Sequence, residues 1–133
     1  MIIWSEEFET GHPAIDQDHR EICERLNQIE VALDRGAGRE QIAEMVSLLQ
    51  NYTLVHFQRE EDAMACAKCP RHGENCAAHT QFAARLDRWL EVLTIPCMNG
   101  TILRDVHAES CRWIQQHIRK IDSSLRQVPV ATR

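Results

Sequence analysis

The sequence predicts an all-α protein: an up-down-up-down four-helix bundle preceded by an N-terminal arm. Four stretches of about twenty residues carry apolar side chains at alternating steps of three and four, the period of an amphipathic helix. Only five Gly and four Pro residues occur, most of them between those stretches. With 133 residues the chain is long enough for a core of its own, so we expect a single domain, residues 1–133.

The composition is ordinary for a soluble globular protein and limits the partners. Charged residues make up 26% of the chain, and the formal net charge is −5 with scattered basic residues. We therefore expect neither nucleic acid nor an anionic membrane as a partner. No apolar run is long enough to span a membrane, and Glu6, Glu7 and Glu9 stand where a signal peptide would be apolar. The expected location is the cytoplasm.

Residues 1–12 are predicted to form the arm, with Trp4 and Phe8 anchoring it on the domain. The first helix is expected at about 13–34, ended by the glycine-containing turn 34–38. Its stripe consists of Ile15, His19, Ile22, Leu26, Ile29 and Leu33.

The other three helices are expected at about 40–65, 72–93 and 101–125, with a loose tail at 127–133. The stripe of the second helix contains Ile42, Met45, Leu49, Tyr52, His56 and Glu60. That of the third contains Asn75, His79, Phe82, Leu86, Trp89 and Leu93. That of the fourth contains Leu103, Val106, Ser110, Trp113 or Ile114, His117 and Ile121.

Polar residues interrupt these apolar stripes in a pattern that suggests metal ligands. His56 and Glu60 lie one helical turn apart where an apolar stripe should continue, and burying them is costly unless something pairs with them. The other helices add His19, His79 and His117, and Asp122 follows five residues after His117. Imidazoles provide neutral nitrogen ligands and a carboxylate can bridge two cations, so this set suits a pair of transition-metal ions.

The alternative interpretation is structural. A single histidine on such a stripe is more often a hydrogen-bonded core residue than a ligand. Six polar residues on the inner stripes of four helices favour the metal centre over that alternative.

Along nearly its whole length the sequence resembles the hemerythrin family, in particular its small bacterial members. The motifs that carry the resemblance are Trp4 and Phe8, Ile15-Asp16-Gln17-Asp18-His19, Asn27, Tyr52, His56-Phe57, Glu60-Glu61, Pro70, His79 with Phe82, and Trp113-Ile114-Gln115-Gln116-His117 with Asp122. The resemblance implies a non-haem centre of two iron ions, joined by an oxo or hydroxo group, that reversibly binds dioxygen as peroxide. It assigns His19 and His56 to one iron and His79 and His117 to the other, with Glu60 and Asp122 as bridges.

One position departs from the family pattern. The third helix of the family supplies two histidines four residues apart; the second is His79 here, but position 75 is Asn. Because an amide oxygen is a weak ligand for iron, three alternatives are open. Each iron has an open coordination position, or the metal at the altered position binds weakly, or a substitute ligand takes the place of Asn75. His72, about one turn before Asn75, is the candidate substitute.

Three of the six cysteines cluster in the motif Cys66-x-x-Cys69-x-x-His72-x-x-x-Cys76. Without a secretory signal we expect free thiols or metal ligands rather than disulfides. The motif is compatible with packing near a helix end, with a small tetrahedral zinc site, or with a redox pair of Cys66 and Cys69. A zinc site would compete with the di-iron site for His72.

Three functions follow from these alternatives. The first is reversible binding of dioxygen, for storage, delivery or sensing, which is binding rather than catalysis. The second is redox chemistry on peroxide, dioxygen or nitric oxide, a consequence of the altered coordination at Asn75. The third is an interaction module stabilised by zinc. A stable oxygenated spectrum, rapid autoxidation, or bound zinc with little iron would separate them.

Overall fold

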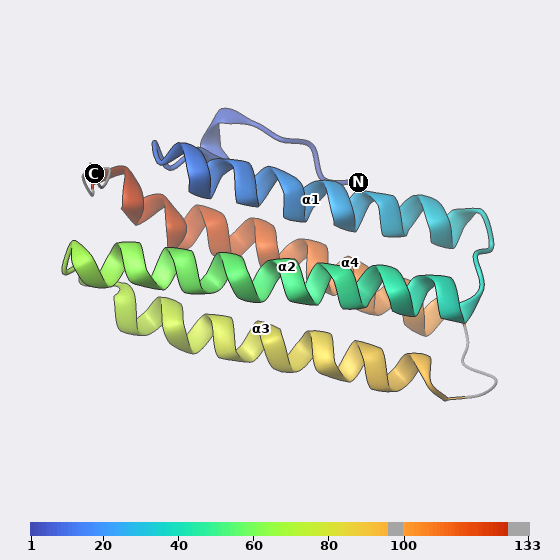
Figure 1. Cartoon of the computed structure of the whole chain (residues 1–133). Helices are drawn as coiled ribbons and strands as arrows, with labels where there is room; N and C mark the ends of the chain where they lie inside the picture. The colour runs from blue at the N-terminus through green and yellow to red at the C-terminus, as the bar shows by residue number, and fades with distance from the viewer. Residues whose placement is uncertain (96–99, 128–133) are drawn as a thin grey trace.

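The computed structural model describes residues 1–95 and 100–127, and this part of the chain contains no strand. Its α-helices are α1 (Pro13–Asp34), α2 (Arg39–Cys66), α3 (His72–Leu93) and α4 (Gly100–Lys120), with the short 3-10 helices η1 (Glu6–Phe8) and η2 (Asp122–Gln127). Each α-helix packs against the next and α4 packs against α1, and successive helices run in opposite directions (Figure 1). The predicted all-α four-helix bundle is confirmed.

The turns after α1 and α2 use the same hydrogen-bond pattern. After α1, the Ala37 N–H donates to the Ala32 carbonyl while Gly36 adopts a φ of +74°. After α2, the Cys69 N–H donates to the Met64 carbonyl, but the left-handed residue is Lys68, with a φ of 54°. Glycine adopts this conformation freely and lysine does not, so the turn after α2 carries some backbone strain.

The fourth helix ends earlier than the predicted residue 125. The α-helix stops at Lys120, and the chain continues as the 3-10 helix η2 from Asp122. Two contacts favour the stop: the Ser123 hydroxyl donates to the Arg119 carbonyl at 2.6 Å, and the Arg71 guanidinium donates to the Lys120 carbonyl. Of the predicted tail 127–133, Gln127 belongs to η2 and residues 128–133 lie outside the described part.

The N-terminal arm lies along α1 (Figure 1). The Asn27 side chain holds it in both directions, since Asn27 accepts from the Ile2 N–H at 2.8 Å and donates to the Ile2 carbonyl at 2.9 Å. Phe8 is buried in the core, and the partly buried Trp4 packs against it. None of the described helices is both long and apolar enough to cross a membrane.

The buried apolar residues form two clusters that leave a gap near one end of the bundle. The main cluster, which includes Ile22, Leu26, Ile29, Leu49, Phe57, Phe82, Leu86, Trp89 and Ile114, fills most of the interior. The small cluster consists of Ile15, Met64, Cys69, Ile121 and Leu125. Along α1, His19 lies between members of the two clusters, as Glu60 does along α2. The polar residues of the predicted site therefore lie between two apolar layers.

Two neighbouring leucines of α2 test the position of the main cluster. Leu49 has no exposed surface, whereas Leu48 is 51% exposed. We expect Leu49→Ala to lower the free energy of unfolding by about 2–5 kcal/mol, because it leaves a cavity. Leu48→Ala, the matched control, should change it by less than about 0.5 kcal/mol. Urea unfolding of both variants measures this, and equal losses would contradict the described packing.

Candidate metal centre

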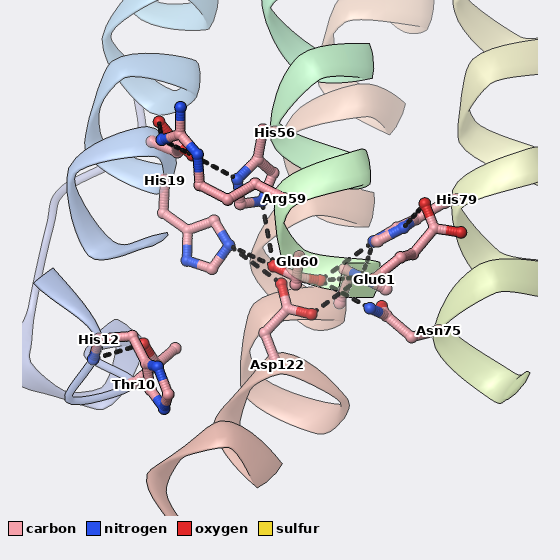
Figure 2. A network of polar contacts seen from close by, with 12 residues as sticks. Thr10, His12, His19, His56, Arg59, Glu60, Glu61, Asn75, His79 and Asp122 are labelled. Atoms are coloured by element: carbon pink, nitrogen blue, oxygen red, sulfur yellow. Dashed lines mark hydrogen bonds and ion pairs between the residues drawn. The ribbon is translucent and has the colours of Figure 1, made fainter. Parts of the chain in front are cut away.

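The six predicted ligands lie at one end of the bundle, where α1 and α3 begin and α2 and α4 end. His19 comes from α1, His56 and Glu60 from α2, His79 from α3, His117 from α4 and Asp122 from the start of η2. All six side chains are buried. Figure 2 shows how the side chains of His19, His56, His79 and Asp122 converge on Glu60.

Glu60 lies at the centre of this group, and each of its oxygens faces its own pair of histidines. Oε2 is 3.1 Å from His19 Nε2 and 3.1 Å from His56 Nε2. Oε1 is 3.1 Å from His79 Nε2 and 3.9 Å from His117 Nε2. The carboxylate thus stands between the two pairs.

Asp122 spans the same two pairs from the other side. Its Oδ2 is 3.1 Å from His19 Nε2, and its Oδ1 is 3.2 Å from His117 Nε2. Two sets of four ligand atoms result, each with its atoms within 4.8 Å of one another. We call His19, His56, Glu60 and Asp122 the first position, and His79, His117, Glu60 and Asp122 the second position.

The donor chemistry of both positions fits a transition-metal ion. Each position offers two imidazole nitrogens and two carboxylate oxygens, a set that suits iron and similar divalent ions. His79 Nε2 and His117 Nε2 lie only 3.1 Å apart, so that at least one of them turns a lone pair toward the other. The Asp122 oxygens face His19 and His117 at 3.1 and 3.2 Å, but within the described part of the chain neither contact has the angles of a well-formed hydrogen bond. A cation would satisfy all of these atoms.

A buried carboxylate behind His56 orients its ring. Asp18 Oδ2 is 3.0 Å from His56 Nδ1, and Asp18 also accepts from Arg59 at 2.7 and 2.8 Å and from the Tyr52 hydroxyl at 3.1 Å. Burial would raise the pKa of Asp18, but its hydrogen bond and charge interaction with His56 lower it. Asp18 therefore stays ionised and keeps the Nε2 of His56 directed at Glu60.

The sequence interpretation gave Asp18 no role. A signal was present, because Tyr52, His56 and Arg59 follow one another at steps of four and three on one face of α2. These three side chains converge on Asp18.

Aromatic rings hold the two histidines of the second position. Phe57 stacks on His79 with ring centroids 3.7 Å apart, and Trp113 stacks on His117 at 4.5 Å. Trp113 in turn stacks on Phe82 at 4.2 Å. These contacts fix the imidazole planes and make the surroundings apolar.

The N-terminal arm and the start of α1 hold η2, and with it Asp122. His12 Nε2 lies 2.9 Å from the Leu125 carbonyl, which accepts its hydrogen bond. The Arg126 guanidinium donates to the carbonyls of Glu9 at 2.7 Å and Glu7 at 2.6 Å. The arm thus helps to place a ligand that is more than a hundred residues away in the sequence.

Asn75 lies at the site, but His72 does not join the ligand sets. The Asn75 side chain is completely buried, and its Nδ2 donates to Glu60 Oε1 at 2.8 Å. His72 is half-buried, with Nε2 at 3.5 Å from Cys76 Sγ, and it belongs to neither set of four. The structure therefore gives no support to His72 as the substitute ligand.

The cysteine motif is spread over different environments. Cys66 is exposed, while Cys69 is buried with Sγ 3.6 Å from the Ser124 hydroxyl, which favours packing for Cys69. A hydrogen bond with Glu61 raises the pKa of the Cys76 thiol to about 11, the opposite of what a reactive or metal-binding thiol needs. Within the described residues Cys66, Cys69, His72 and Cys76 do not form a ligand set.

The carboxylates change the proton affinity of the histidines. Burial would lower the pKa values of His19 and His117, but Asp122 and Glu60 raise that of His19 to about 10 and that of His117 to about 9. Burial would raise the pKa of Glu60, yet its contacts with the histidines, His117 first, hold it well below the usual range. After metal removal these histidines therefore carry protons near neutral pH.

The raised pKa values of His19 and His117 make the stability of the chelator-treated protein depend on pH. A raised histidine pKa stabilises the fold fully below the unfolded value of about 6.5, and the stabilisation is lost as the pH rises through the folded value. We expect the free energy of unfolding to fall between pH 6.5 and about 10, following His117 and then His19. Urea unfolding across this range measures it.

His117→Gln serves as the control for this experiment, because it should remove the part of the fall that His117 contributes between about pH 6.5 and 9. A stability that stays constant or rises over the same range would contradict the charge arrangement.

Comparison with known proteins identifies the family. Residues 10–127 match the Hemerythrin HHE cation binding domain. Bacteriohemerythrin of Stenotrophomonas maltophilia is 29% identical over 125 residues, which cover 93% of this chain and 78% of that protein. Bacteriohemerythrin of Pseudomonas aeruginosa (strain LESB58) is 29% identical over 122 residues, covering 92% and 77%. That of Clostridium acetobutylicum is 24% identical over 128 residues, covering 92% and 96%. The chain belongs to the hemerythrin family of non-haem iron-binding domains.

Proposed function

We propose that this chain holds two iron ions and binds dioxygen reversibly, for storage, delivery or sensing. The observation that carries the proposal is the double set of ligands. Glu60 and Asp122 each direct one oxygen to the first position and the other oxygen to the second. His19 and His56 would hold one ion, and His79 and His117 the other. Iron supplies the electrons on which binding and release of dioxygen depend.

The surrounding side chains suit reversible binding because they keep the site dry. Phe57 and Trp113 lie against His79 and His117. Met64 lies against Asn75, and the two apolar clusters cover the site on both sides. The charged products of irreversible oxidation are poorly stabilised in such apolar surroundings. Release of dioxygen as the neutral molecule is therefore favoured over that oxidation. The proposal needs no acid or base beyond the ligand residues.

The first test is iron content together with an optical spectrum of the reduced protein before and after exposure to air. We expect about two irons per chain, as the two ligand sets imply, and a charge-transfer band that appears in air and disappears on deoxygenation. One iron or fewer, or a ferric spectrum that never reverts, would overturn the proposal.

A second candidate function rests on Asn75. This amide occupies a buried position beside the second ligand set, which contains only two imidazoles. An additional open coordination position would favour turnover of peroxide, dioxygen or nitric oxide. Rapid autoxidation or sustained peroxide consumption by the loaded protein would support this redox function over reversible binding.

The role of Glu60 as the shared ligand gives a direct prediction. Glu60→Gln removes the negative charge and one of the two ligand oxygens, so we expect iron content to fall from about two to one or fewer per chain. Asp62→Asn, on the exposed side of the same helix, is the matched control and should keep both ions. Metal analysis after gel filtration measures both variants; full iron content in Glu60→Gln would contradict the shared role.

A further inference from the structure

The two ligand sets have equal numbers of donors but unequal surroundings. Each has two imidazole nitrogens, one oxygen of Glu60 and one of Asp122. The residues behind these ligands differ between the positions. The residues that contact a ligand side chain determine its orientation and basicity. The two positions should therefore differ in metal affinity.

In the first position, His56 has a strong supporting contact, whereas Nδ1 of His19 has no hydrogen-bond partner among the described residues. His56 Nδ1 is 3.0 Å from Asp18 Oδ2, and Arg59 fixes Asp18 at 2.7 Å. This carboxylate accepts the hydrogen bond from Nδ1 and orients the ring, so that Nε2 is the nitrogen that faces the metal position and can bind an ion once its own proton is released. The ring of His56 is therefore held in its binding orientation before an ion arrives.

In the second position, His79 lacks an equivalent contact among the described residues. His79 Nδ1 is 3.5 Å from Glu61 Oε2 and makes no hydrogen bond there. Glu61 is also 26% exposed, which weakens its electrostatic influence through solvent screening. Stacking on Phe57 fixes the ring plane of His79 but does not raise the basicity of its nitrogen.

Asn75 acts on the second position through Glu60. Its Nδ2 donates to Glu60 Oε1 at 2.8 Å, and Oε1 is the oxygen that faces His79. The reversed amide would place Oδ1 against a carboxylate oxygen, so electrostatic repulsion fixes the donor orientation. The hydrogen bond occupies a lone pair and draws charge from the oxygen that a metal ion in the second position needs. Asn75 Oδ1 is buried with no partner in the described part of the chain.

We propose that Asn75 makes the two positions unequal by acting as a hydrogen-bond donor to Glu60 rather than as a metal ligand. One ion enters the first position, and a second ion enters the second position with lower affinity. This inference rests on the proposed function, because it assumes two metal ions per chain. Asn75 is a positioning residue, since it acts on the metal through Glu60.

Anaerobic titration of the chelator-treated protein with Co²⁺, followed by calorimetry and the visible spectrum, tests the inference. For the natural sequence we expect two steps of one ion each, with affinities that differ by about tenfold or more. Asn75→Leu removes the donor at similar volume, so the second step should tighten severalfold while the first stays unchanged. Asn75→His adds a nitrogen ligand and should tighten the second step further, by about 10- to 100-fold.

Two other variants assign the steps. Asp18→Asn should weaken the first step by about 10- to 100-fold, because it removes the carboxylate behind His56. His72→Gln should change neither step, since His72 lies outside both ligand sets. Loss of the second step in His72→Gln would make His72 the ligand and overturn the inference. Circular dichroism checks the fold of each variant, and Asn75→Ala removes the same donor if Asn75→Leu does not fold.

The outcomes separate this inference from the proposed function. Two ions that bind with one affinity would overturn the inference and leave the di-iron proposal intact. A second step that weakens tenfold in Asn75→Leu would also overturn it, since Asn75 would then be a ligand. Binding of at most one ion to the natural sequence and to Asn75→His would overturn the proposed function itself.

Discussion

The structure depends on one buried carboxylate. Glu60 has no exposed surface, and histidines from α1, α2, α3 and α4 surround it within 3.9 Å. Burying an ionised carboxylate costs several kcal/mol unless cations or donors compensate for the lost water. This requirement explains why each helix gives up an apolar position at the same end of the bundle. It also makes Glu60 the natural bridge, because its two oxygens already face different histidine pairs.

Stability and binding are divided between regions of the bundle. The main apolar cluster fills the interior on one side of the site and contains most of the buried apolar residues of the described chain. The small cluster around Met64 and Leu125 covers the open end, and the contacts of the arm with η2 hold that cover in place. The site can therefore carry buried charges, an unpartnered amide oxygen and closely spaced nitrogens without unfolding, because the remainder of the core offsets their cost.

The helical stripes were enough to predict the bundle, and they led to His19, His56, Glu60, His79 and His117, which the structure brings together. Asp122 follows His117 by five residues, about 140° around an ideal helix, and reaches the site because α4 gives way to η2 after Lys120. The end of α4 at this point is favoured by the Ser123 hydroxyl and by the hydrogen bond from Arg71 to the Lys120 carbonyl. The Arg71 contact joins residues far apart in the sequence, so a periodic pattern does not contain it. The role of Asp18 was missed for the same reason, since its partners come from α2. His107 was missed as a buried residue because its partner is the main-chain carbonyl of Leu26, on another helix.

The proposed function requires that two metal ions share Glu60 and Asp122, whose oxygens face both histidine pairs. X-ray absorption at the iron edge of the loaded protein tests it most directly, because the scattering reports the distance between neighbouring ions and the elements that bind them. We expect an iron–iron distance of about 3.5 Å and nitrogen and oxygen ligands only. A protein that carries two irons per chain but shows no iron–iron scattering, or shows sulfur ligands, would contradict it.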